Sequence, residues 1–488
     1  MQGGFSTLDW SIFFGYFLLL GGSSYLLSRE KISSTREYFS AKNSMPTFGV
    51  ALSLVATSQS AATFLGVPDF SYKFDFTFIG FSLSALIAVF FISHYLIPLL
   101  YKHKVVTVYE LLESRYSTKA KEQAGMLFLV GRIFASGARL YIAAVAISMI
   151  LFSDVTFLHI LYATLFLLFG ALLYTYFGGI KSVIYSDIIQ ATLYIGAGVI
   201  VVYYLLDTLH IENIFMQLKE AQKLTLFTTQ SDAKFSLFTL VSGWLLLNIA
   251  AFGLDQDMMQ RVLSAKDAKE ATKALWFSIV LTIPVVLLFL TIGVLLFLFY
   301  QEQELVNKFQ GENISVFMHY ILTQLPDGIK AFVTVGAVAA ALSSTNSVLG
   351  AMASVAIEDI YKPYMQRKKE LSEAHYLKAS KIAILLFAFL LFVMSLFSFY
   401  AQHYTQLSLI GFALGVMAFA YTGLLGVFAS ALFSSRGTGQ LVPFALAGGF
   451  ICVLIQQPYI FGLHSSFTVQ MLSGTALSFF IMQLQKES

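Results

Sequence analysis

The feature that most constrains this fold is the division of the chain into apolar blocks that match the thickness of a bilayer. A helix needs about 20 apolar residues to cross the hydrocarbon core. Only 12% of the 488 residues are charged, which is about half of the share in soluble chains. We therefore predict an all-α, polytopic membrane protein whose thirteen transmembrane helices lie at 8–28, 47–70, 78–101, 124–153, 157–177, 184–206, 236–256, 273–300, 329–358, 379–400, 404–433, 440–456 and 465–484.

The distribution of basic residues predicts how these helices are oriented. Cytoplasmic connections of membrane proteins are enriched in Lys and Arg. With the N-terminus outside, the inner connections carry 22 of these residues and the outer loops carry five. No basic region precedes the first block, as it would in a signal peptide, so 8–28 is predicted to be retained. We expect a single domain over 1–488 in the cell (inner or plasma) membrane, with an outer N-terminus and a cytoplasmic C-terminus.

The motifs of enzymes are missing from the sequence. It contains no phosphate-binding loop or nucleophile elbow, and its eight histidines form no metal-spaced motif. The single cysteine, Cys452, excludes a disulfide framework. We predict that the protein is not an enzyme, and we expect neither a nucleic-acid partner nor an obligatory protein partner.

Two hydroxyl-rich runs, 56–63 (ATSQSAAT) and 343–347 (SSTNS), interrupt apolar blocks. An unsatisfied polar group in hydrocarbon costs several kcal/mol, so such runs face a protein interior or a water-filled cavity. A break in the first helix would free carbonyls for Na⁺, and Ser343, Asn346 and Ser347 share one helical face. Small neutral oxygens suit a hard cation. The alternative is close helix packing through small residues.

Asp187, Arg132 and Arg139 are charged residues within the predicted spans that are candidates for a functional role. Asp187 opens the sixth span, either as a functional acid or as an N-terminal acid favoured by the helix dipole. Arg132 and Arg139 are seven residues apart in the fourth span, and so lie on nearly the same face. A buried guanidinium has to be paired or to bind an anion. These arginines therefore either clamp a substrate carboxylate or neutralise Asp187 or another internal acid.

Three motifs make the chain similar to the sodium–solute symporter family, whose members carry glucose, proline, pantothenate, monocarboxylates or sialic acids. They have the order and the span positions that the family uses, and the resemblance covers nearly the whole chain. The motifs are Tyr176-Phe177-Gly178-Gly179 followed by Ser186-Asp187-Ile188-Ile189-Gln190, Asp255-Gln256-Asp257 followed by Gln260-Arg261 and Ala265-Lys266, and Ala339–Ser347 followed by Asp359-Ile360-Tyr361.

The resemblance implies a LeuT-type core of two inverted five-helix repeats. The repeats would cover 47–206 and 236–433, with an extra N-terminal helix over 8–28 and extra C-terminal helices over 440–484. The first helix of each repeat, 47–70 or 236–256, would be discontinuous.

The resemblance also implies sodium sites between the second and ninth spans. The ligands of the first site, carried over by motif, are the carbonyls of Ala56, Gln59 and Ala340 and the hydroxyls of Ser343 and Ser344. Some members hold a second Na⁺ with the acid of the sixth span, which implies Asp187, Ser343, Asn346 and Ser347 here. Asn346 stands where those members have serine, and its amide oxygen could still be a ligand.

For the substrate, the sialic acid carriers of the family imply Ser58, Ser60, Thr63 and Arg132. Ser82 replaces a glutamine that those carriers use, which is a departure from sialic acid recognition. The Gly137–Leu140 stretch, which contains Arg139, resembles the proline and pantothenate carriers instead. Both likenesses indicate a carboxylate-bearing substrate.

We therefore expect a sodium-coupled symporter that imports a small organic solute by alternating access. Na⁺ and solute would each raise the affinity of the other, and membrane lipid would surround the protein. A proton-coupled carrier is an alternative, in which Asp187 would titrate. A membrane-embedded sensor is the alternative of another class. Because Ser488 closely follows the last span, a sensor would act through a separate partner protein.

Overall fold

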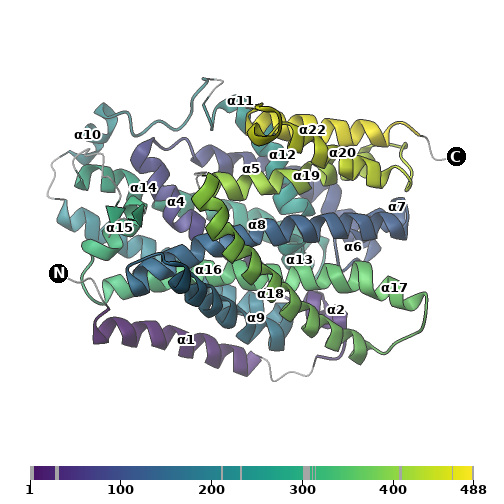
Figure 1. Ribbon diagram of the computed structural model, residues 1–488, viewed down its shortest axis with the longest axis horizontal. Coiled ribbons are helices and arrows are strands. Elements are labelled where there is room, and N and C mark those ends of the chain that lie inside the picture. Colours follow the sequence, from purple (N-terminus) through teal and green to yellow (C-terminus); the bar gives the residue numbers. More distant parts are fainter. Residues whose placement is uncertain are drawn as a thin grey trace.

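The computed structural model describes residues 5–27, 32–209, 213–230, 233–300, 308–309, 312–313, 315–405, 409–463 and 465–485. Most of these residues lie in helices that run side by side in a bundle (Figure 1). The elements up to residue 220 are α1 (Thr7–Leu27), α2 (Thr35–Ser40), the 3₁₀ turn η1 (Ala41–Asn43), α3 (Thr47–Ser58), α4 (Ala61–Lys73), α5 (Ile79–Phe91), the π-helical η2 (Ile92–Leu96), α6 (Ile97–His103), α7 (Glu110–Arg115), α8 (Thr118–Phe152), α9 (Phe157–Thr208) and α10 (Ile214–Glu220).

The second part of the chain is built in the same way, with one short antiparallel ladder among its described residues. Its elements are α11 (Leu237–Leu240), α12 (Gly243–Ile249), the π-helical η3 (Ala250–Leu254), α13 (Gln256–Val262), α14 (Ala268–Phe299), β1 (Lys308–Phe309), β2 (Glu312–Asn313), α15 (Val316–Thr323), α16 (Ile329–Ser354), the π-helical η4 (Val355–Tyr361), α17 (Lys362–Gln366), α18 (Glu373–Thr405), α19 (Leu409–Phe433), α20 (Val442–Ile455), α21 (Pro458–Phe461) and α22 (Phe467–Met482).

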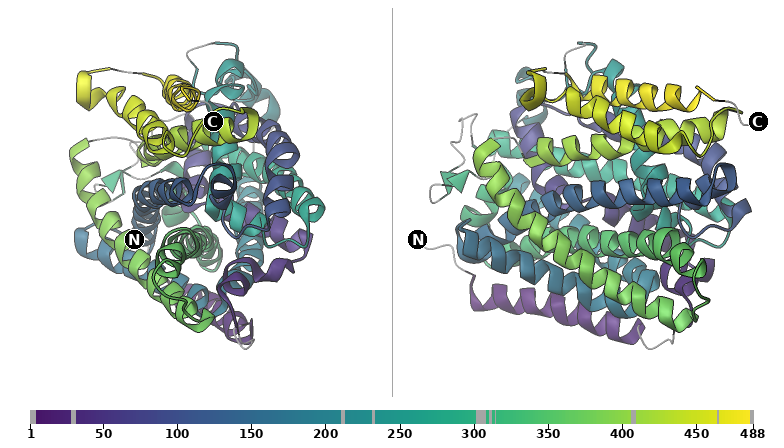
Figure 2. Two further views of the ribbon diagram at one scale, coloured as in Figure 1. Left: turned by 90° about the vertical axis from the view of Figure 1, so that its right-hand side faces the viewer. Right: turned by 45° about the vertical axis from the view of Figure 1, so that its right-hand side comes forward.

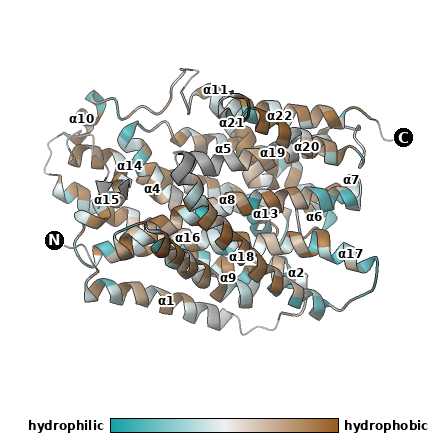
Figure 3. Cartoon of the chain, viewed as in Figure 1, coloured by the Kyte–Doolittle hydropathy of each residue, from teal (hydrophilic) through white to brown (hydrophobic). Residues whose placement is uncertain are grey.

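Each of the thirteen predicted spans contains helix, but their number stays a prediction. By length and composition, seven described helices could cross a membrane, or up to eight if the bent pair α3–α4 is one span. The described parts of α19, α20 and α22 are apolar but shorter. Residue 28 of the first predicted span and 406–408 of the eleventh lie outside the described residues. Hydrophilic stretches gather at the two ends of the bundle, and apolar ones lie between (Figure 3).

The added helices flank the bundle on opposite sides. In both views of Figure 2, α1 lies along one edge and α20 and α22 lie along the other. Figure 1 also places the start of α1 and the end of α22 at opposite ends of the bundle. The sides of the membrane on which the two termini lie stay a prediction.

Both helices that we predicted to be discontinuous are broken. Between α3 and α4, Gln59 and Ser60 have extended backbone and the two helices differ in direction by 61°. In the second repeat the break comes at Asp255, where φ is −82° and ψ is 118°. The helix resumes after this break as α13, beyond the predicted span of 236–256, and the described apolar helix that could cross a membrane here covers Leu237–Leu254.

The element α9 folds back on itself at Gly179, where φ is 58° and ψ is −159°. Its two halves both lie along α16 but in opposite directions. The neighbours on α16 are Leu342 for Gly170 and Asn346 for Thr175 in the first half, and Ser343 for Asp187 and Gly336 for Ala197 in the second half. These halves correspond to the predicted spans 157–177 and 184–206. The loop predicted over 178–183 is reduced to a sharp turn, which glycine makes possible because it has no Cβ.

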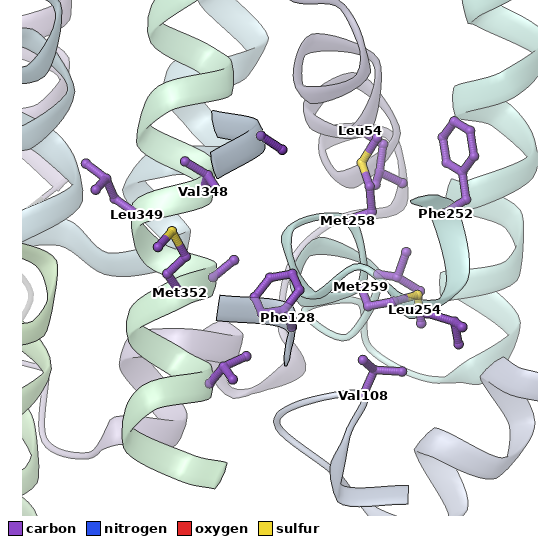
Figure 4. Packing of buried hydrophobic residues seen from close by; sticks show 14 of the residues in the cluster. Leu54, Val108, Phe128, Phe252, Leu254, Met258, Met259, Val348, Leu349 and Met352 are labelled. Carbon is purple, nitrogen blue, oxygen red and sulfur yellow. The ribbon is translucent and has the colours of Figure 1, made fainter. Parts of the chain in front are cut away.

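The core of the bundle forms where α16 meets α3, α8 and α13. Small residues along α16, including Ala339–Ala341, let neighbouring backbones approach closely. Towards one end of the bundle, larger apolar side chains fill the space between these helices (Figure 4), including Leu54, Phe128, Met258, Met259, Val348, Leu349 and Met352. This packing holds the polar runs of α3 and α16 inside the protein.

Candidate functional site

The acid Asp187 forms the centre of a fully buried polar cluster in the second half of α9. Ser343 of α16 donates to Oδ1 across 2.8 Å, and Ser53 of α3 donates to Oδ2 across 2.5 Å. Arg261 of α13 donates to Oδ2 from Nη2 across 2.9 Å and to Ser53 from Nε across 2.8 Å. Three helices that are distant in sequence thus converge on one carboxylate. The alternative of an interfacial N-terminal acid is wrong, because Asp187 lies in mid-helix and is 0% exposed.

The cluster continues as a chain of alternating charges. Nη1 of Arg261 lies 2.9 Å from the Asp257 carbonyl and 3.3 Å from Oδ1 of Asp257. Oδ2 of Asp257 lies 2.8 Å from Nη2 of Arg132, which lies 3.0 Å from Oδ2 of Asp255. Tyr421 of α19 donates to Asp255, completing a buried path from Asp187 to α19. Unsatisfied buried charge is costly, and this sequence meets that cost by alternating acid and base.

These ion pairs bear on the structural alternative for Arg132. Arg132 does neutralise internal acids, but they are Asp255 and Asp257, and Asp187 is paired with Arg261. Nε of Arg132 is buried and has no acceptor among the described residues. The guanidinium therefore keeps one hydrogen-bond donor without an acceptor in the described part of the chain. Its role in binding substrate stays a prediction.

Arg139 does not belong to this series of ion pairs, and it meets no carboxylate among the described residues. Its Nη2 lies 3.0 Å from the Met417 sulfur. With Ser136 it lines a small cavity on the side of α16 that carries Ser344 and Thr345. One wall of this cavity therefore has a guanidinium with no carboxylate partner in the described part of the chain, and the facing wall has two hydroxyl-bearing residues.

The helix break supplies the other polar groups of the predicted sites. Gln59 closes α3, and Ser60 opens α4 with a capping box that it shares with Thr63. Ser58 donates to the carbonyl of Val55 across 2.9 Å. Ser58, Ser60 and Thr63 are half-buried, whereas Ala56 and Gln59 are buried. Because the backbone is extended at Gln59 and Ser60, carbonyls at the end of α3 are released from helical bonding, as a cation site requires.

On α16 the predicted ligands divide between two surroundings. Ser344 donates to the carbonyls of Ala340 and Ala341, both across 3.1 Å, so Ala340 and Ser344 are adjacent. Asn346 and Ser347 line a second small cavity with Thr175, Gly179 and Gln260. Ser343 is the one predicted partner that hydrogen-bonds to Asp187, and neither Asn346 nor Ser347 does so among the described residues. Ser82 is buried on α5, which packs against α12.

The short helix α2 closes one end of this region. Tyr38 donates from its hydroxyl to the carbonyls of Thr175 (2.8 Å) and Tyr176 (3.0 Å), beside the turn of α9. The Gln260 amide donates to the Phe39 carbonyl across 3.0 Å. Thr35 donates its backbone N–H to Glu373 of α18 across 3.0 Å. The helix α2 thus connects α9, α13 and α18 immediately before α3 begins.

Arg261, Asp257 and Ser53 were not predicted as site residues, although Arg261 and Asp257 belong to one of the family motifs. Arg261 lies between the predicted spans 236–256 and 273–300, yet its side chain is 0% exposed. The signal that could have revealed it is the spacing of Asp257 and Arg261. Opposite charges four residues apart on a helix can pair, and such a pair beside an apolar span is not typical of a solvated loop.

Comparisons with known proteins agree with this architecture. A model of the Sodium:solute symporter family matches residues 38–448. The chain is 28% identical over 388 residues to the sodium/sialic acid symporter SiaT of Proteus mirabilis, covering 78% of this chain and 76% of that protein. It is 25% identical to the sodium/glucose cotransporter of Vibrio parahaemolyticus, covering 75% of this chain and 70% of that protein.

Among solved structures, the substrate-bound outward-open state of a Na⁺-coupled sialic acid symporter matches with a TM-score of 0.84. The two chains are 22% identical, and the match covers 98% of this chain and 97% of the other. This match confirms the predicted all-α membrane fold with a LeuT-type core. The boundaries of the two repeats stay predictions.

Proposed function

The chain belongs to the sodium:solute symporter family, and from this premise we propose that it imports a small organic solute with Na⁺ by alternating access. The observation that carries the proposal is the broken α3–α4 helix beside the hydroxyl-rich face of α16 and the buried acid Asp187. Interrupted helices at the centre of transporters release carbonyls for coupling ions. The sialic acid and glucose carriers to which the chain is similar are named as sodium-coupled.

We assign the first sodium site to the carbonyls of Ala56, Gln59 and Ala340 and the hydroxyls of Ser343 and Ser344. The donor set fits Na⁺, because it offers neutral oxygens to a hard cation. A second site would use Asp187 with Ser343, and its completion by Asn346 and Ser347 would require these side chains to turn from their present cavity. Na⁺ here is a transported substrate rather than a resident cofactor.

For the solute we propose a carboxylate that reaches Arg139. Arg132 already faces Asp255 and Asp257, whereas Arg139 lines a cavity with Ser344 and has no acid partner among the described residues. Planar guanidinium groups bind carboxylates through paired hydrogen bonds. Ser58, Ser60, Thr63 and Ser82 would contact the rest of the solute. A carboxylate at Arg139 would lie close to the first Na⁺, so that the two ligands attract each other.

We also propose that the protein lies in the cell membrane among lipids, with its N-terminus outside and its C-terminus in the cytoplasm. The excess of basic residues in the connections assigned to the inside supports this orientation. No obligatory protein partner or nucleic acid is needed for the proposed cycle.

The first test is the thermal stability of the purified protein in NaCl against matched KCl and choline chloride at several pH values. A ligand that binds the folded state raises its stability with a saturating dependence on concentration. We expect saturating stabilisation by Na⁺ alone. Stabilisation that follows pH and ignores Na⁺ would contradict the proposal and favour a proton-coupled carrier that uses Asp187.

A further inference from the structure

The guanidinium of Arg261 occupies the position of a cation beside Asp187. It contacts Oδ2 from both Nη2 (2.9 Å) and Nε (3.3 Å), and Nε also donates to Ser53. Both side chains are 0% exposed. In this arrangement the acid of the second sodium site already has a positive partner supplied by the protein.

A Na⁺ ion that joined Asp187 while Arg261 stayed in place would meet a second positive charge nearby. Repulsion between like charges at such distances is strong where water is excluded. Desolvating the ion would also cost free energy that a carboxylate already paired with Arg261 could recover only in part. Simultaneous binding of both cations to Asp187 is therefore unfavourable.

A second acid lies within reach of the same guanidinium. Nη1 of Arg261 is 3.3 Å from Oδ1 of Asp257, on the side facing away from Asp187. Asp257 and Asp255 share Arg132, so the buried chain has three carboxylates and two guanidiniums. Its formal charge is one negative, which a single Na⁺ would balance. Arg261 can thus leave Asp187 without losing a carboxylate partner.

We propose that Arg261 is a tethered cation that holds Asp187 when the second site lacks Na⁺, and that Na⁺ displaces it towards Asp257. Arg261 then acts as an internal competitor that weakens Na⁺ binding at this site. When Na⁺ leaves, Arg261 returns and neutralises the acid, so an unpaired carboxylate is not left in the core. The inference rests on the proposed function, since it takes Na⁺ to be the coupling ion.

The experiment measures half-saturating NaCl for thermal stabilisation of purified protein, with KCl keeping the ionic strength constant. A Ser344→Ala background weakens the first site, so that the remaining Na⁺ dependence reports the second. We expect Arg261→Gln in this background to lower the half-saturating concentration about tenfold, within the usual range of coupling between sites. The matched control is Arg367→Gln, which removes an exposed guanidinium that contacts Glu122, and it should leave the value unchanged.

An unchanged or higher half-saturating concentration in Arg261→Gln would overturn the inference. If that variant does not fold, Arg261→Lys provides the same test, because lysine keeps the charge but loses the forked contacts of arginine. We expect it to lower the value several-fold, and no decrease would again count against competition. Absence of any Na⁺ dependence in the unmodified protein would instead defeat the proposed function, so the two failures are distinguishable.

Discussion

Ser343 donates a hydrogen bond of 2.8 Å to Oδ1 of Asp187, across two helices whose paired residues are 156 positions apart in sequence. Ser343 belongs to both sets of proposed sodium ligands, whereas Asp187 belongs only to the second. The bond therefore connects the two proposed sites through one side chain. Substitutions that separate the effects of the two sites therefore have to be made at ligands that belong to one site alone, and not at Ser343.

Replacing Ser344 by alanine should weaken Na⁺-stimulated uptake while leaving membrane insertion intact. The change removes one hydroxyl ligand of the first proposed site, and among the described residues the Ser344 hydroxyl bonds only to carbonyls of its own helix. Uptake against NaCl concentration in proteoliposomes checks this, with Ser11→Ala as a control at an exposed hydroxyl of α1. Full activity of Ser344→Ala at low Na⁺ would remove Ser344 from the site.

Replacing Arg132 by glutamine should strongly destabilise the protein. The variant leaves Asp255 and Asp257 buried beside each other without their shared cation. Removing one partner of a buried ion pair typically costs about 3–5 kcal/mol of the free energy of unfolding. Thermal unfolding of the purified variant measures the loss. A melting temperature equal to that of the unmodified protein would show that these acids do not depend on Arg132.

Replacing Arg139 by glutamine should have a different result, because this guanidinium has no acid partner among the described residues. We expect stability close to that of the unmodified protein but a large loss of carboxylate binding. An arginine–carboxylate contact is worth about 1.5–3 kcal/mol, which corresponds to at least a tenfold change in affinity. Binding of a panel of small carboxylates to both proteins tests this. Equal affinities would exclude Arg139 from the solute site.

Replacing Gly179 by alanine should disrupt the turn of α9. A side chain at its φ of 58° and ψ of −159° is strained, and an added Cβ would lie 2.5 Å from the Tyr38 carbonyl oxygen. Strained backbone of this kind costs about 1–3 kcal/mol. The matched control is Gly15→Ala in α1, where an added Cβ has nothing within 4 Å. Comparable melting temperatures for the two variants would contradict the prediction.

The pH dependence of stability should include a contribution from Glu110, in the connection between α6 and α8. Burial raises the pKa of Glu110 from 4.5 to about 7, although the Thr107 and Val106 backbone N–H groups oppose the shift. Because the folded state keeps its proton longer, stability falls as pH rises from 4.5 to about 7, by at most about 1.4 kcal/mol per pH unit. Glu110→Gln should flatten this decline and be more stable at pH 8.

Glu113, one turn further along α7, provides a control because its pKa shift has the opposite sign to that of Glu110. Burial opposes the shift, but the ion pair with Lys121 and the hydrogen bond from Thr118 lower the pKa of Glu113 below 4.5. The stabilisation that Glu113 contributes is fully present above pH 4.5, and it is lost as the pH falls through the lower pKa of the folded state. Glu113→Gln should therefore be less stable at neutral pH. The same sign of change in both variants would contradict these assignments.

Much of the fold followed from local patterns. Apolar length located helices in every predicted span, and the hydroxyl-rich run around Gln59 located the break between α3 and α4. Both signals are local, since a break needs small polar residues and a span needs a continuous apolar stretch. The discontinuity of the second helix followed from the family resemblance and not from its own local pattern, because its break at Asp255 lies at the edge of an apolar block, where charge normally marks the end of a helix.

The pairing of the buried charges could not be predicted in the same way. Asp187 and Arg261 are separated by 74 residues, and their contact depends on how α9, α3 and α13 converge. Arg132 and Arg139 are alike by sequence position, yet within the described part of the chain only Arg132 meets acids. Helical periodicity gives the face on which a residue lies, but it does not give the rotation of that face towards a neighbouring helix.

The attachments of α2 have a consequence for the kinetics of any opening at that end. A movement that carries α2 away from α9, α13 and α18 has to break the bonds that involve Tyr38, Gln260 and Thr35. Because Tyr38 bonds to both Thr175 and Tyr176, these are four bonds, and at about 0.5–1.5 kcal/mol each they set a threshold of about 2–6 kcal/mol. They anchor one short helix and so must yield together. The opening would then be a cooperative and infrequent transition between two states.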